Sequence, residues 1–186
     1  MKITAGVDEV GRGSLIGPVY AAAVILNKSI NIRLLKDSKL VAKDKRELLS
    51  NYIKKNSIWA IGKASKNEID KMNILQASLL AMKRAIKKLK KKPSIVLIDG
   101  NKLPVLNNYK LKAIIKGDQK IPSISAASVI AKVSRDKFII SLSKKNVGYN
   151  WDQNLGYGTK QHLKAIKKLG VNKHHRKTFS PVSKMI

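Results

Sequence analysis

Acidic side chains are rare in this 186-residue sequence, and four of them stand where they could form a metal site. The chain has 11 Asp and Glu residues against 39 Lys and Arg residues. Asp8 and Glu9 are adjacent at the end of an apolar run, and Asp99 and Asp118 each follow a later one. Sites in open α/β sheets lie beyond the carboxyl ends of the strands, so we expect these side chains to converge there.

Clustered carboxylates repel one another and raise one another's pKa unless a cation compensates their charge. All-oxygen ligands favour Mg²⁺ or Mn²⁺ over zinc, and the chain has no cysteine that would favour zinc. A pair of such ions, about 3.5–4 Å apart, serves phosphoryl chemistry in many enzymes. The residues alone leave two interpretations open, a carboxylate metal site or four scattered surface acids.

The net charge of +28 would attract polyanions, nucleic acid above all. Only six of the 39 cationic residues are arginine, and Lys, Ile and Asn are all plentiful. An A/T-rich genome also produces such a composition, so a generic basic protein stays an alternative. The absence of cysteine excludes a disulfide framework and a thiol nucleophile. The longest apolar run, 18–26, is too short to cross a bilayer, and the first residues lack a secretory signal, so we expect a soluble cytoplasmic protein.

Hydrophobic periodicity predicts the elements that must position the acids. Apolar or alternating runs predict strands at 3–8, 19–26, 57–64, 94–98 and 111–115. Apolar residues at helical spacing predict helices at 43–56, from 73 to about 86, at 124–142 and at 159–169. Three early strands followed by helices that alternate with single strands predict an α/β fold with a mixed sheet.

Short motifs follow one another along almost the whole chain. They are GVDEVGRG at 6–13 with GPV at 17–19, DSK at 37–39, IDGN at 98–101, KGD at 116–118 followed by SAASVIAKVSRD at 125–136, GYGT at 156–159 with His162, and HRKTFSPV at 175–182. Together and in this order they resemble ribonuclease HII, the type 2 class of ribonuclease H. Two positions depart from the family pattern, because a second lysine is missing after 37–39 and Leu155 stands where a lysine is common.

The resemblance implies a ribonuclease H-like fold, a five-stranded mixed sheet flanked by helices, as a single domain over 1–186 with an irregular C-terminal arm from about 171. It implies that Asp8, Glu9, Asp99 and Asp118 are the catalytic metal ligands and hold two Mg²⁺ or Mn²⁺ ions. The implied activity is endonucleolytic. It would hydrolyse the RNA strand of RNA–DNA hybrids and cut 5′ to single ribonucleotides in duplex DNA, leaving 3′-hydroxyl and 5′-phosphate ends.

The resemblance also implies substrate contacts. It assigns the ribose 2′-hydroxyl to Gly11, Arg12 and Gly13, and glycines do let a backbone approach a sugar closely. Tyr157 would stack on the sugar after the ribonucleotide, and Lys39 would contact the nucleic-acid backbone. From the residues themselves, we expect Ser125, Ser128 and Lys132 to contact that backbone as well. Without the resemblance, the Gly-Arg-Gly sequence is an ordinary turn and the tyrosine a packing residue.

Two other functions remain as alternatives, a nuclease of the same fold with another nucleic-acid substrate and a non-catalytic basic binding protein. Dependence on Mg²⁺ or Mn²⁺ would separate an enzyme from a binding protein. Ribonuclease HIII normally carries an extra N-terminal domain, for which Asp8 lies too near the start. The expected partners are RNA–DNA hybrids and ribonucleotide-containing duplex DNA. We expect a monomer, no membrane contact and no sliding-clamp partner, because the last residues contain no Gln-rich apolar peptide.

Overall fold

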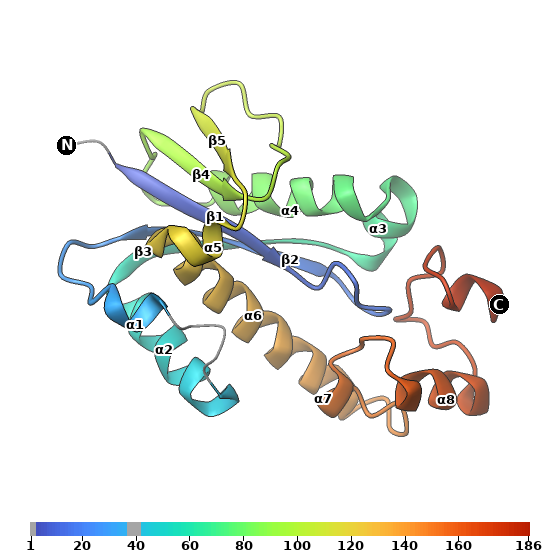
Figure 1. Cartoon of the computed structure of the whole chain (residues 1–186). Coiled ribbons are helices and arrows are strands. Elements are labelled where there is room, and N and C mark those ends of the chain that lie inside the picture. The colour runs from blue at the N-terminus through green and yellow to red at the C-terminus, as the bar shows by residue number, and fades with distance from the viewer. Residues whose placement is uncertain (1–2, 37–41) are drawn as a thin grey trace.

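The computed structural model describes residues 3–36 and 42–186, and it has a central sheet with helices on both faces (Figure 1). The strands are β1 (Thr4–Val10), β2 (Val19–Leu26), β3 (Ser57–Ala64), β4 (Ile95–Asp99) and β5 (Leu111–Ile114), in the spatial order β3-β2-β1-β4-β5. β1, β2 and β3 pair antiparallel, whereas β4 pairs parallel with both β1 and β5. The predicted five-stranded mixed sheet is therefore confirmed.

One face of the sheet is covered by α4 (Ile74–Lys87), which follows the short helix α3 (Lys66–Met72). Both helices begin with side-chain caps. The Ser65 hydroxyl accepts from the Glu68 amide in a reciprocal capping box, and Asn73 accepts from the Gln76 amide. Ala21 and Ala23 of β2 face the α4 side, where their small side chains allow close packing of the helix on the sheet.

The opposite face is covered by α6 (Pro122–Ser143), the longest helix among the described residues, on which α1 (Arg33–Lys36) and α2 (Lys43–Lys55) pack. Ala22 and Val24, the alternate residues of β2, face this side. The start of α6 lies so close to β1 that a Cβ atom at Gly6 would overlap the backbone of Ser123. This contact fixes the small-residue face of α6 against the strand that carries Asp8.

The chain that follows α6 packs around the far end of this helix (Figure 1). It contains α7 (Trp151–Asn154), α8 (Lys160–Leu169) and a 3₁₀ helix at Val182–Lys184. A third hydrophobic cluster joins these elements to the β1–β2 loop; its buried members are Leu15, Ile16, Ile139, Tyr149, Trp151, Ala165, Ile166 and Val182. The chain after 170 is irregular apart from the 3₁₀ helix.

The predicted long elements are all present with their ends shifted by a few residues. Short helices that the periodicity did not predict are α1, α3, α5 (Gly117–Lys120) and α7. No helix in the described part of the chain is long and apolar enough to cross a bilayer.

Candidate active site

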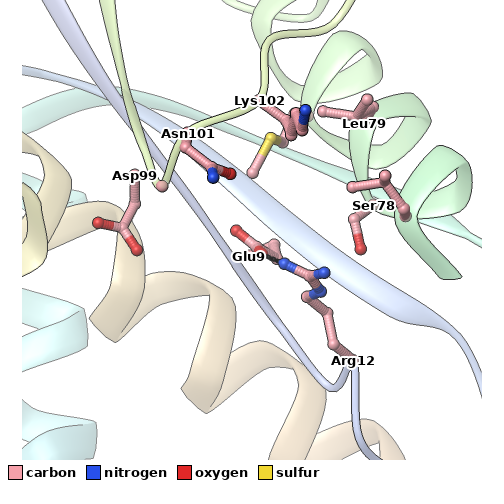
Figure 2. A pocket seen from close by; sticks show the side chains of 10 residues that line it. Glu9, Arg12, Ser78, Leu79, Asp99, Asn101 and Lys102 are labelled. Carbon is pink, nitrogen blue, oxygen red and sulfur yellow. Dashed lines mark hydrogen bonds and ion pairs between the residues drawn. The ribbon is translucent and has the colours of Figure 1, made fainter. Parts of the chain in front are cut away.

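The sheet places Asp8, from the motif at 6–13, and Asp99, from the motif at 98–101, at the ends of neighbouring strands. β1 and β4 are parallel, and Val7 of β1 pairs with Ile98 of β4, so Asp8 and Asp99 occupy the next matching positions. Glu9 follows on β1 and lines a pocket of about 320 Å³ together with Asp99. Figure 2 shows Glu9 between Arg12 and Asp99 in this pocket, with Ser78 and Leu79 of α4 beside it.

Asp8 is buried between β1 and α6, with only 6% of the residue exposed. Its Oδ1 accepts the Glu9 amide at 2.7 Å, and the Ser128 hydroxyl on α6 donates to its carboxyl group. Burial is the main reason that the pKa of Asp8 lies well above its ordinary value, and the charges of Glu9 and Asp99 raise it further. The protein alone therefore does not compensate this carboxylate.

Glu9 has one satisfied and one unsatisfied oxygen. Its Oε1 accepts from the Arg12 guanidinium at 3.1 Å, whereas Oε2 is buried and has no hydrogen-bond partner among the described residues. Burial raises the pKa of Glu9, and Asp99 adds to this, although Arg12 acts in the opposite direction. A buried carboxylate oxygen without a donor is unfavourable, and a cation would satisfy it.

Asp99 and Asp118 are linked through the turn between them. Oδ1 of Asp99 accepts the Gly117 amide at 2.6 Å, and Lys116 turns the chain with a left-handed φ of 54°. Asp118 follows in the first turn of α5 and lines a separate depression with Ile32 and Ser125, rather than the pocket of Glu9 and Asp99. The structure thus brings Asp8, Glu9 and Asp99 together and places Asp118 beside them.

Across residues 3–36 and 42–186, no three acidic or histidine side chains are close enough together to ligate one ion as they stand. The chemistry of the group nevertheless fits divalent cations. The pKa of Asp8 and that of Glu9 are raised partly by like charge, one oxygen of Glu9 lacks a donor, and the donors are all oxygens. A divalent ion would remove both unfavourable features.

The Gly-Arg-Gly segment and Tyr157 also come together. Ser14 forms an isolated β-bridge with Tyr157, and the Leu15 amide donates to the Gly156 carbonyl at 2.8 Å. Arg12 and Gly13 are exposed, and nothing lies within 4 Å of a Cβ atom built on Gly13. The chain at Arg12 and Gly13 is therefore open to solvent.

Two other predicted substrate contacts have different positions. Lys39 falls outside the described residues. Ser125 is buried, with its hydroxyl donating to the Leu35 carbonyl at 2.6 Å, on the wall of the depression beside Asp118.

Sequence reasoning missed two buried arginines that support the site, Arg135 and Arg176, which lie behind the Gly-Arg-Gly segment. The signal was in the composition, because six arginines among 39 cations are few enough to examine one by one. Ser128, for which a contact with the nucleic-acid backbone was predicted, bonds Asp8. His162, for which no metal role was predicted, accepts from Trp151 Nε1 at 2.9 Å and contacts the Tyr157 carbonyl through Nδ1.

Comparisons with known proteins identify the family and the fold. The family model described as ribonuclease HII matches residues 5–182. The chain is 76% identical over 186 residues to ribonuclease HII of Pelagibacter ubique (strain HTCC1062), with 100% of both chains covered. The crystal structure of ribonuclease H2 from Pyrococcus horikoshii OT3 superposes with a TM-score of 0.80 at 26% identity, covering 98% of this chain and 96% of that one. Bst ribonuclease HIII in complex with Mn²⁺ has the same fold, with a TM-score of 0.80 at 17% identity over 99% of this chain and 69% of that one.

Proposed function

The chain belongs to the ribonuclease HII family and is a ribonuclease H, and we propose that it cuts duplex DNA on the 5′ side of single embedded ribonucleotides as well as the RNA strand of RNA–DNA hybrids. The observation that carries this proposal is the placement of two features side by side. Carboxylates at the ends of β1 and β4 lie beside Arg12, and the exposed residues Arg12 and Gly13 lead into Ser14, which pairs with Tyr157.

Asp8, Glu9, Asp99 and Asp118 are the residues that would hold two Mg²⁺ or Mn²⁺ ions. Bound there, such ions would supply Lewis-acid activation of the scissile phosphate and of water. Hydrolysis of the bond between phosphorus and the 3′ oxygen would leave 3′-hydroxyl and 5′-phosphate ends. The protein's own contribution is to fix the carboxylates on the sheet. Asp8 is held by Ser128 and the Glu9 amide, and Asp99 by the Gly117 amide, so their oxygens have defined positions before substrate arrives.

Substrate selection falls to the neighbouring loop. The backbone of Gly11 to Gly13 would contact the ribose 2′-hydroxyl, the group that distinguishes RNA from DNA. Tyr157 would pack on the adjacent sugar, while Lys39 and Ser125 would contact the nucleic-acid backbone. Arg12 bonds Glu9, so one residue joins the sugar-reading segment to the carboxylates.

We also propose that residues 1–186 act as one domain and as a monomer. Support comes from α6, which contributes Ala126 to the cluster on the sheet and Ile139 to the C-terminal cluster, so one helix joins the two parts.

The test is cleavage of a labelled DNA duplex with one ribonucleotide in Mg²⁺, beside an all-DNA duplex and an Asp99→Asn variant. We expect a cut on the 5′ side of the ribonucleotide by the wild type and none in the other two reactions. Cleavage of both duplexes would make the protein a general nuclease. Binding without cleavage in Mg²⁺ and in Mn²⁺ would contradict the catalytic proposal.

A further inference from the structure

Arg176 is a fully buried arginine in the C-terminal chain, and all three of its guanidinium nitrogens bond the β1–β2 loop. Its Nε donates to the Gly17 carbonyl at 3.0 Å, one terminal nitrogen donates to the Arg12 carbonyl at 2.8 Å, and the other donates to the Gly11 carbonyl at 2.8 Å. Figure 1 shows the C-terminal chain beside the end of this loop. One side chain therefore connects both ends of the segment 11–17.

These bonds orient the peptide groups that would meet the substrate. The C=O and N–H of a trans peptide point in opposite directions. The Gly11 carbonyl belongs to the peptide with the Arg12 amide, and the Arg12 carbonyl belongs to the peptide with the Gly13 amide. Because Arg176 holds both carbonyls on the buried side, the amides of Arg12 and Gly13 face the other side, where both residues are exposed.

A second buried arginine makes the burial of the Arg176 charge energetically unfavourable. Arg135 lies directly under Gly11, where a Cβ atom would overlap its side chain, and it donates to the Leu155 carbonyl at 3.2 Å. Its guanidinium lies 5.4 Å from the Tyr157 ring. Burial, together with the charge of Arg135, lowers the pKa of Arg176 to about 9. Two like charges buried together destabilise a fold, so apolar side chains would serve packing alone better.

We propose that Arg176 is a positioning residue for ribose recognition, which presents the Arg12 and Gly13 amides to the 2′-hydroxyl and so sets the preference for RNA over DNA. This inference rests on the proposed reading of the sugar by Gly11, Arg12 and Gly13. It adds a residue more than 150 positions away in the sequence, whose planar fork spans three carbonyls. A lysine side chain presents all of its N–H donors from one nitrogen atom and cannot reach the three carbonyl groups at once.

The variants separate positioning from simple stabilisation. Arg176→Lys keeps the charge and loses the fork, and Arg176→Gln keeps a planar donor group without the charge. Val182→Ala is the matched control, because Val182 is fully buried in the hydrophobic cluster of the C-terminal elements and forms no hydrogen bond with the β1–β2 loop, all of which lies within the described residues. For each protein, three quantities are measured: the melting temperature, the single-turnover rate on the ribonucleotide duplex in Mg²⁺, and the Kd for ribonucleotide and all-DNA duplexes in EDTA.

We expect the single-turnover rate of Arg176→Lys to fall about tenfold or more, at a temperature where it is fully folded, and that of Arg176→Gln to fall as well. The Kd for all-DNA duplex should stay within about twofold, because surface cations contact phosphates whatever the sugar. Any preference of the wild type for the ribonucleotide duplex in EDTA should shrink in both variants. Val182→Ala should lower the melting temperature while it keeps a rate within about threefold of wild type.

Two results would overturn the inference. A folded Arg176→Lys or Arg176→Gln with the wild-type rate would show that the fork is not needed. If Val182→Ala loses as much single-turnover rate as the Arg176 variants for the same fall in melting temperature, Arg176 only stabilises the fold. The proposed function fails separately and visibly in the wild type alone, if that protein cuts all-DNA and ribonucleotide duplexes alike.

Discussion

The carboxylate group (Asp8, Glu9 and Asp99) and the histidine cluster that packs against the β1–β2 loop (Trp151, His162 and His175) are built on opposite principles. In the carboxylate group, burial and like charge oppose the ionisation of Asp8 and Glu9, and Glu9 Oε2 has no donor among the described residues. In the histidine cluster the ring nitrogens are bonded. Trp151 Nε1 donates to His162 Nε2, the His175 Nε2 atom lies 3.2 Å from the same nitrogen, and His175 Nδ1 accepts the Asn172 amide at 2.9 Å.

This difference distinguishes residues that require a cation from residues that stabilise the fold. The carboxylate group is incomplete as protein alone, which is the condition expected of groups that bind a cation. The histidine cluster is complete without a ligand, and through His162 and the Tyr157 carbonyl it fixes the loop on which Tyr157 stands. Substitutions in the first region should therefore change activity more than stability, and substitutions in the second should do the reverse.

The largest effect should come from Asp8→Asn. We expect cleavage to fall by about a thousandfold or more, because several kcal/mol of transition-state stabilisation depends on ions held by the carboxylates. The melting temperature in EDTA should not fall, since the change removes a buried charge and keeps an oxygen that can accept from Ser128.

Rate assays and thermal unfolding measure the two sides of this prediction. Asp44→Asn, at an exposed acid in the first turn of α2, is the control and should leave cleavage unchanged. A large loss of stability in Asp8→Asn would contradict the division between the two regions.

Tyr157 stands on the loop that His162 of the histidine cluster contacts, and its substitutions should give the next largest effect. If its ring packs on a sugar, Tyr157→Ala should lower the single-turnover rate about tenfold, since stacking contributes about 1–3 kcal/mol. Tyr157→Phe keeps the ring, and it should also keep the cation–π contact with Arg135 at 5.4 Å. Equal losses in both variants would assign the role to the hydroxyl group instead.

The fold and the positions of Asp8, Glu9 and Asp99 at strand ends could be predicted because local sequence marks the strands. Apolar runs mark strands, and an acid that ends a run lies at a strand end, as Asp99 does in β4. The short helix α3 escaped because its sequence, KNEIDKM, is polar; its capping box, Ser65 with Glu68, was a readable signal. α7 had no such signal, since its formation depends on the burial of Trp151 in a distant cluster.

The hydrogen bonds that hold the β1–β2 loop could not be predicted in the same way. The bond from Arg176 to Gly17 joins residues 159 positions apart, and no local pattern encodes such a contact. The position of Asp118 shows a similar limit. The sequence placed it correctly after β5, but the left-handed turn at Lys116 decides that it lines a neighbouring depression.

Acid should destabilise the histidine cluster. Burial lowers the pKa of His162, and it lowers that of His175 to about 4 with help from the charge of His162. A group with a lowered folded pKa prefers to be neutral in the fold. For histidine this stability is therefore complete above the unfolded pKa of about 6.5, and it is lost as pH falls toward the folded value. His175 should cost about 2 kcal/mol of unfolding free energy between pH 7 and pH 5.

Denaturant unfolding in EDTA at several pH values measures this slope. His175→Gln should flatten it, although the variant is less stable at pH 7, whereas His174→Gln should change it less because His174 is only half-buried. The raised pKa of Asp8 acts with the opposite sign, since its unfavourable charge is relieved as pH falls. The change of the wild-type unfolding free energy with pH therefore contains opposing contributions from the histidine cluster and from Asp8. Because Asp8→Asn removes the second contribution, the stability of this variant should fall more steeply in acid than that of the wild type. An unchanged slope in His175→Gln would contradict the neutral, buried histidine.

The smallest effect should be the response of stability to divalent ions. A ligand that binds only the folded state stabilises it, so millimolar Mg²⁺ or Mn²⁺ should raise the melting temperature by about 2–4 °C for each 1 kcal/mol of binding energy. The rise should disappear in Asp8→Asn and in Asp99→Asn, and it should persist in His175→Gln, whose change lies away from the carboxylates. Sodium chloride at matched ionic strength separates ion binding from general screening. A rise that sodium reproduces, or that survives both carboxylate changes, would place the cation elsewhere on the protein. The carboxylate group would then lack the compensation that the raised pKa values of Asp8 and Glu9 and the unpaired oxygen of Glu9 require.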